Sequence, residues 1–67
     1  MKKLTENNNL MRHMKTAKLL IEGIEESVIM NDGGYWNPPE YSRESIKRRC
    51  VQARQELLRV YQEVNNA

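Results

Sequence analysis

Apolar residues repeat along two segments of the chain with the spacing of a coiled coil. In the first segment, gaps of four and three residues alternate at Leu10, Met14, Ala17, Ile21, Ile24 and Val28. The second segment has the same spacing at Ile46, Cys50, Ala53, Leu57, Val60 and Val64. Residues spaced in this way lie on one side of an α-helix. We therefore predict two amphipathic helices, over residues 10–30 and 38–64, whose apolar sides form the predicted seam.

The segment between these helices contains the residues that end one helix and start another. Residues 31–37 include Gly33 and Gly34, and either glycine can take the positive φ that closes a helix. Asn37 as N-cap, Pro38 at the first helical position and Glu40 at the third would start the second helix, and Ser42 is a second candidate cap. We expect a turn over 31–37.

The first nine residues are polar and end in three asparagines, any of which can cap the first helix because its amide oxygen accepts from a free backbone N–H. No proline interrupts either periodic segment. A polar segment over 1–9 and two helices therefore make up a single domain over residues 1–67.

Folding the chain back at the turn pairs the two helices in antiparallel fashion. In the expected register, Ala17 meets Leu57 and Ile21 meets Ala53, so that small residues face large ones, as interdigitated packing requires. The same register pairs opposite charges, Glu25 with Lys47 and His13 with Glu63. The predicted fold is an all-α, antiparallel, coiled-coil-like two-helix hairpin.

Several apolar residues are left outside the predicted seam. Those expected to form an oligomer interface are Met11, Leu20, Ile29, Val51, Leu58 and Tyr61. A 67-residue chain buries only about 60% of its unfolded surface, and domains of this size commonly need a disulfide, a metal or a partner subunit. A single cysteine allows no internal disulfide. We therefore expect a homodimer that forms a four-helix bundle, or a larger oligomer.

Composition and charge favour no nucleic-acid or membrane class. The net charge is only +2 although 30% of residues are charged, so the charges are mixed rather than massed. The longest aliphatic run, residues 19–21, is far too short for a membrane span. A lone cysteine is typical of a reducing compartment, so we expect a cytoplasmic protein.

The sequence has no pattern typical of an enzyme. Cys50 lies on the predicted seam, where a thiol is buried and inert, and His13 is expected to be a solvated or ion-paired residue at the edge of that seam. Glutamates 22, 25 and 26 lack the Glu-x-x-His spacing of helical metal sites, and Gly33-Gly34 lacks the lysine of a phosphate-binding loop. We expect no catalytic residue, no metal and no cofactor.

Two aromatic residues in the turn either fold back to cover the end of the hairpin or form an exposed anchor for a protein partner, and both can be true. Tyr35 and Trp36 are of the residue types that dominate protein–protein hot spots, and Arg43 and Lys47 follow them at the start of the second helix. We therefore predict a non-enzymatic protein–protein interaction module of the adaptor, inhibitor or co-chaperone type. A small hairpin with asparagine-rich ends is the kind of regulator that a phage or mobile element encodes.

The basic start of the second helix leaves an alternative open. Lys18, Arg48, Arg49 and Arg54 could bind an anion, either RNA or a nucleotide, across an oligomer interface. The two hypotheses differ in one feature of the fold. The arginines either converge on one open surface or pair with glutamates 22, 25 and 26.

Overall fold

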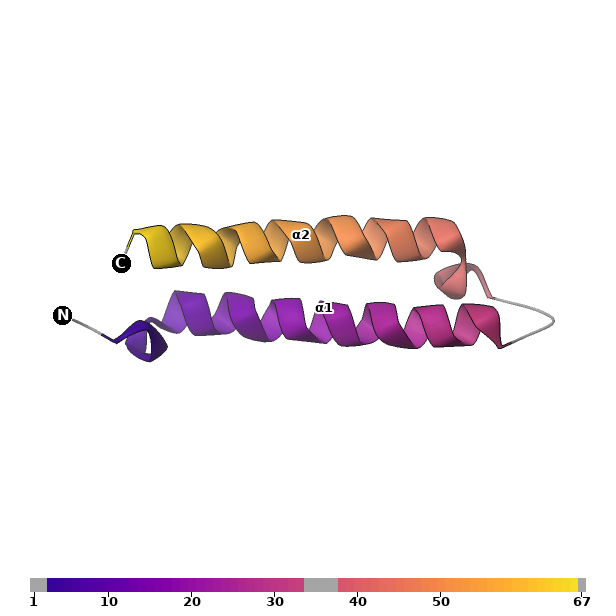
Figure 1. The fold of residues 1–67 in the computed structure, drawn as a ribbon, viewed down its shortest axis with the longest axis horizontal. Helices are drawn as coiled ribbons and strands as arrows, with labels where there is room; N and C mark the ends of the chain where they lie inside the picture. The colour runs from indigo at the N-terminus through magenta and orange to yellow at the C-terminus, as the bar shows by residue number, and fades with distance from the viewer. Residues whose placement is uncertain (1–2, 34–37, 67) are drawn as a thin grey trace.

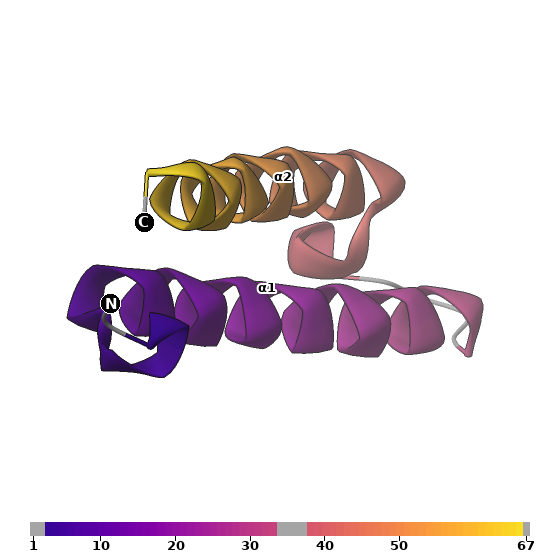
Figure 2. The same ribbon diagram turned by 60° about the vertical axis from the view of Figure 1, so that its left-hand side comes forward.

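The computed structural model describes residues 3–33 and 38–66, and these form an antiparallel pair of helices (Figures 1 and 2). Helix α1 spans Asn8–Asp32 and helix α2 spans Arg43–Asn65. A short 3₁₀ helix precedes each of them, η1 at Leu4–Glu6 and η2 at Pro39–Tyr41. Within the described ranges every element is helical and α1 packs along α2, which confirms the predicted all-α fold with two packed helices.

Helix α1 begins where the asparagine cluster predicts a cap. The side-chain oxygen of Asn7 accepts from the backbone N–H of Leu10 at 3.1 Å, so Asn7 is the N-cap. The helix continues to Asp32, past the predicted end at Met30, and is followed by Gly33. Gly33 has φ −90°, so this glycine does not supply the positive φ, and Gly34, the other candidate, lies outside the described residues.

Helix α2 begins at Arg43 rather than at the predicted Pro38. The reason is the double proline, because a residue that precedes proline is driven out of the α conformation. Pro38 accordingly has an extended backbone, with φ −60° and ψ 155°, and Pro39 starts η2 instead. Ser42, the second candidate, is the N-cap of α2, and its side chain accepts from the N–H of Ser45 at 3.2 Å.

Half of the predicted seam lies between the helices. Its buried or half-buried members are Leu10, Ala17 and Ile24 on α1 and Ile46, Ala53 and Val60 on α2. We call these two rows the central columns. Leu10, Ala17 and Ala53 are the only buried hydrophobic residues in the described part of the chain, with exposed fractions of 2%, 3% and 5%. The interior of the hairpin is therefore thin and contains two alanines.

The other half of the predicted seam is wrong, because its members are exposed. They are Met14, Ile21 and Val28 on α1 and Cys50, Leu57 and Val64 on α2. In each case the residue just before the exposed one is more deeply buried: His13, Leu20 and Ser27 on α1 and Arg49, Glu56 and Glu63 on α2. Each central column is flanked on both sides by a column of residues about 50° away around the helix. Both flanking columns have the same heptad spacing. In the hairpin, the flanking column with more polar side chains is the one that lies towards the other helix.

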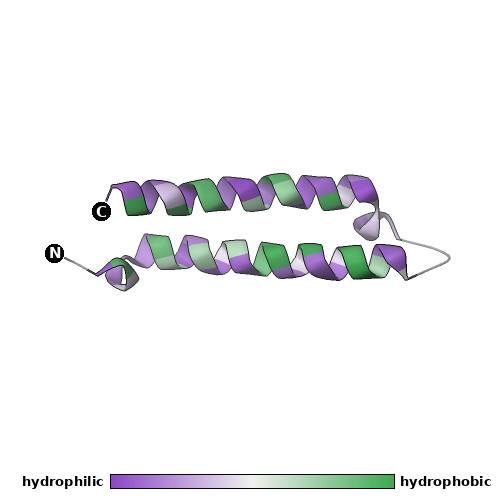
Figure 3. Cartoon of the chain, viewed as in Figure 1, coloured by the Kyte–Doolittle hydropathy of each residue, from purple (hydrophilic) through white to green (hydrophobic). Residues whose placement is uncertain are grey.

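Antiparallel packing places the two exposed columns on the same side of the hairpin. The helices run in opposite directions, and in each helix the exposed column follows the central column in the same rotational sense. The six exposed residues Met14, Ile21, Val28, Cys50, Leu57 and Val64 therefore share one side, which we call the apolar face. The opposite side, which we call the polar face, carries His13, Ser27, Arg49, Glu56 and Glu63. Hydrophobic bands along both helices are visible in Figure 3.

Candidate functional site

The polar face contains a buried hydrogen-bonded cluster centred on Ser27. The Ser27 side chain is fully buried and donates to the carbonyl oxygen of Gly23 at 2.8 Å. The Arg49 guanidinium reaches across from α2 and donates to the Ser27 hydroxyl and, at 3.4 Å, to the Gly23 carbonyl. A hydrogen bond from a charged donor contributes roughly 1.5–3 kcal/mol, so this contact ties α2 to one position along α1.

A second polar cluster lies near the open end of the hairpin. Nδ1 of His13 and Oε2 of Glu56 are 3.0 Å apart, and Arg59 donates to the other oxygen of Glu56 at 2.6 Å. Beyond it, the Asn7 amide donates to Glu63 at 3.0 Å. The predicted contact of His13 with Glu63 is therefore wrong, because α1 is displaced along α2 relative to the predicted register. The prediction that His13 is a paired residue at the edge of the helix contact fits the pair with Glu56.

The turn end of the hairpin is fixed by a further cross-link. The Asn31 amide donates to the backbone carbonyl of Tyr41 at 2.7 Å, which joins the end of α1 to η2. In the described part of the chain no buried side-chain nitrogen or oxygen lacks a partner. Polar contacts at both ends and in the middle thus fix the direction and register of the hairpin, and sequence analysis missed them. The signal was present as heptad-spaced polar residues beside each central column.

The apolar face is a candidate docking surface. Its large side chains are 44–50% exposed, which is high for six residues in one continuous strip. The whole chain exposes 5775 Å², whereas a compact monomer of 7.9 kDa exposes about 4,400 Å². The radius of gyration of the chain, 15.1 Å, likewise exceeds the roughly 11 Å expected for a compact domain of this length. The hairpin alone leaves most of the large apolar side chains of its described residues exposed.

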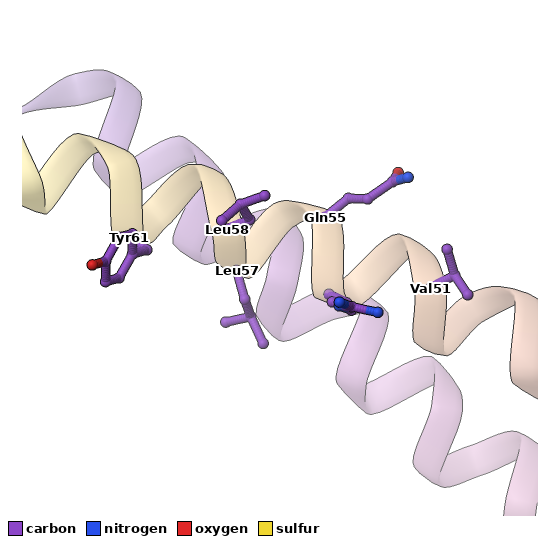
Figure 4. A pocket seen from close by; sticks show the side chains of 6 residues that line it. Val51, Gln55, Leu57, Leu58 and Tyr61 are labelled. Atoms are coloured by element: carbon purple, nitrogen blue, oxygen red, sulfur yellow. The ribbon is translucent and has the colours of Figure 1, made fainter.

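The residues predicted to form an oligomer interface are divided among several surfaces. Val51 and Leu58 are exposed on the outer side of α2, and Tyr61 is exposed on the side of Leu57. Together with Arg54, Gln55 and Leu57 they line a surface hollow of about 540 Å³ (Figure 4). Figure 4 shows these side chains spreading around α2 rather than converging on a point. The polar side chains that line the hollow are those of Arg54, Gln55 and Tyr61.

The remaining predicted interface residues belong to α1. Met11 and Ile29 are exposed, with exposed fractions of 41% and 61%, and are available to a partner. Leu20 is half-buried, in the column of the polar face that contacts α2. It therefore contributes to the contact between the two helices of the hairpin.

The basic residues of α2 neither converge nor pair with the acids of α1. Successive helical residues are rotated by about 100°, so Arg48, Arg49 and Arg54 point in three directions, each more than about 90° from the others. Arg49 is held by Ser27 and Gly23 rather than by a glutamate. The described ion pairs are His13 with Glu56, Lys47 with Glu44 at 3.7 Å and Arg59 with Glu56.

Two consequences follow for individual charges. The predicted pairing of Glu25 with Lys47 inside one chain is wrong, because these side chains lie on opposite outer edges of the hairpin and Lys47 pairs with Glu44 instead. Lys18, Arg48 and Arg54 are exposed and form no ion pair with any described residue.

The predicted partner-binding residues are only partly described. Arg43 and Lys47 are exposed at the start of α2, whereas Tyr35 and Trp36 lie outside the described residues, so their role stays a prediction. The prediction of a buried Cys50 is wrong, because this thiol is exposed on the apolar face. The predicted seam has the correct heptad spacing. It placed the column of Cys50 between the two helices, whereas this column is exposed.

The described residues offer no candidate metal centre, since no three histidine, cysteine, aspartate or glutamate side chains among them are grouped to hold an ion. Neither described helix is long and apolar enough to cross a membrane. No family model, no curated protein and no solved structure matches this chain.

Proposed function

We propose that the protein is a non-enzymatic protein–protein interaction module that works as a homo-oligomer, of the adaptor, inhibitor or co-chaperone type. The observation that carries this proposal is the apolar face, whose six residues form one strip that the chain itself leaves uncovered. Full burial of one large aliphatic side chain contributes about 1.5–3 kcal/mol. A hydrogen bond of the polar face that involves a charged group contributes a similar amount, roughly 1.5–3 kcal/mol. Covering a strip with five large apolar side chains therefore adds substantially to the stabilising free energy.

Sedimentation equilibrium and thermal unfolding over a range of protein concentrations test this proposal. Binding of a second subunit to the folded state stabilises it by mass action, so the Tm should rise with concentration together with the fitted mass. A folded monomer whose Tm is the same at low and at high micromolar concentration would contradict self-association.

A partner other than the protein itself would bind on surfaces that remain open in the oligomer. Val51 and Leu58 on the outer side of α2 support such a surface, and Trp36 with Arg43 is the second candidate. Capture from a host lysate by the wild-type chain and by Trp36→Ala tests the second candidate. Loss of the same captured protein in the variant, with the oligomer mass unchanged, is the expected result. Equal capture by both chains would contradict it.

Anion binding is the second candidate function, and one observation favours it. Lys18 and Arg54 are exposed and unpaired among the described residues, and both border the apolar face. An oligomer that closes over this face would bring such cations from two chains together. Titration with an RNA oligonucleotide and with a nucleotide, using wild type and the double variant Lys18→Gln/Arg54→Gln, tests it. Binding that is absent, or that persists in the double variant, would contradict this second candidate.

A further inference from the structure

We infer that the apolar face is covered by the same face of a second copy of this chain, around a two-fold axis that runs parallel to the helices. In this arrangement α1 of each copy lies on α2 of the other, and every pair of neighbouring helices is antiparallel. The inference rests on the proposed self-association and adds to it the face, the symmetry and the contacting residues.

The exposed area fits one further hairpin. The chain exposes about 1,400 Å² more than a compact monomer of its mass would. A standard protein–protein interface removes about 800 Å² from each partner. Because the helices are long and straight, with extents of 54 × 15 × 12 Å, a second hairpin can cover the face along its whole length. Four helices packed in this way form a bundle with apolar residues inside.

The charges along the two edges of the apolar face decide which helices meet. The edge on α1 carries Met11, Lys18 and Glu25, and the edge on α2 carries Lys47, Arg54 and Tyr61. Each edge lies about 50° beyond the exposed column of its helix, so it points towards the edge of the second copy. All six of these residues are exposed in the single hairpin.

The hydrogen bonds of the polar face set the heights of these residues along the hairpin. Asn7 bonds to Glu63, which places Met11 near the height of Tyr61. Arg49 also bonds to the Gly23 carbonyl, which places Glu25 near the height of Lys47. Rotation about an axis parallel to the helices keeps every residue at its own height.

In the inferred dimer each α1 edge therefore meets the α2 edge of the second copy at matching heights. Met11 contacts Tyr61 of the second copy, and Glu25 pairs with Lys47 of the second copy. Lys18 lies near Arg54 of the second copy, which is a like-charge contact. Each edge thus combines one apolar contact, one ion pair and one repulsion.

The other symmetric arrangement has no ion pair at its edges. A two-fold axis perpendicular to the helices would stack α1 on α1 and α2 on α2 in antiparallel fashion. With the ends aligned, Lys18 would meet Lys18 and Arg54 would meet Arg54 of the second copy, while Glu25 would face Met11. Both arrangements contain two like-charge contacts in each dimer, so the two ion pairs between Glu25 and Lys47 favour α1 on α2.

Disulfide cross-linking between copies tests the arrangement, in a Cys50→Ala background that leaves no other thiol. One chain carries Glu25→Cys and another carries Lys47→Cys, and the two are mixed under oxidising conditions. We expect a covalent dimer in the mixture and in neither chain alone, because a disulfide forms only between cysteines whose Cα atoms are within about 7 Å. The matched control is Lys18→Cys alone, which cross-links to itself only if α1 lies on α1.

The outcomes distinguish a failure of the arrangement from a failure of self-association. A covalent dimer from Lys18→Cys alone, or no covalent dimer although sedimentation shows a dimer, overturns the arrangement and leaves self-association standing. A folded monomer by sedimentation overturns both. Covalent dimers confined to the mixture support both.

A charge substitution provides a second readout that needs no cysteine. Lys18→Glu should lower the dimer dissociation constant several-fold, because the substituted side chain attracts Arg54 of the second copy where the lysine repelled it. In the α1-on-α1 arrangement the same change only exchanges one like-charge pair for another. An unchanged or raised dissociation constant for Lys18→Glu would overturn the inferred arrangement.

Discussion

The polar face and the apolar face flank the same central columns with the same heptad spacing, but they have opposite chemistry. On the polar face, Ser27 is fully buried and bonded to Arg49, and His13 is bonded to Glu56. On the apolar face, Ile21 and Leu57 are about half exposed. The comparison indicates that one side of the hairpin sets its register and the other side provides the driving force for binding.

This division follows from the physics of the two kinds of contact. A buried polar group that loses its partner costs about 1–3 kcal/mol, so polar pairs penalise every register except one. Apolar contacts are non-directional and scale with the area removed from water. A polar face therefore suits the fixed contact within the hairpin, and an apolar face suits association with another surface.

The largest expected effect comes from placing a charge on the apolar face. Leu57→Lys puts one lysine on the face of each copy, so two charges would be buried in every dimer. We expect the dissociation constant measured by sedimentation to rise at least 100-fold, which corresponds to about 2.7 kcal/mol.

Leu19→Lys is the matched control, because Leu19 is 60% exposed on the outer side of α1, away from the apolar face. It should leave the dimer mass unchanged. Equal effects of the two substitutions would mean that the apolar face is not the surface that associates.

Overfilling a central column should have the next largest effect. Ala53 is only 5% exposed, so leucine at this position pushes α2 away from α1 and disturbs both faces together. We expect Ala53→Leu to lower the free energy of unfolding by about 1–3 kcal/mol, measured by urea denaturation. Gln62→Leu adds an aliphatic side chain at an exposed position of the same helix and should change it little. A neutral Ala53→Leu would show that the central column is not closely packed.

The polar face is tested by removing one hydroxyl. In Ser27→Ala, Arg49 loses the hydroxyl that accepts from it, and only the longer contact with the Gly23 carbonyl remains. We expect a loss of about 1–2 kcal/mol in the free energy of unfolding, with the dimer arrangement preserved. Thr16→Ala removes an exposed hydroxyl that bonds only to a carbonyl of its own helix, and serves as the control. Equal losses in the two variants would mean that the Arg49 contact contributes nothing specific.

The sequence predicts the central columns well, but it does not predict which of the two faces is buried. Heptad spacing identified the central columns, including Ala17 and Ala53, because any antiparallel pairing of these helices buries them. Heptad spacing could not show which flanking column is buried, because the column of Ser27 and the column of Val28 both repeat every seven residues. Hydrophobicity favoured Val28, and the hairpin buries Ser27. Which column is buried depends on how far the Arg49 side chain reaches and on which contacts are left for another chain. The spacing of apolar residues shows neither.

The sequence predicts the start of α1 better than the start of α2. The cap at Asn7 could be predicted because one side chain and one N–H are sufficient to form it. The start of α2 was misplaced because the effect of Pro39 on Pro38 outweighs the general preference for proline at the first helical position.

The smallest expected effect is a gain in stability at Gly23, beside the buried cluster of the polar face. A Cβ built on Gly23 has no atom within 4 Å, and the backbone there is helical without a positive φ. Alanine should therefore recover the helix propensity that glycine lacks, raising the free energy of unfolding by roughly 0.5–1 kcal/mol. The carbonyl that accepts from Ser27 and Arg49 belongs to the backbone and is retained. Since Gly23 lies away from the apolar face, the dissociation constant of the dimer should not change. If Gly23→Ala weakened the dimer instead, the second copy would have to lie on the polar face, and the division between the two faces would be wrong.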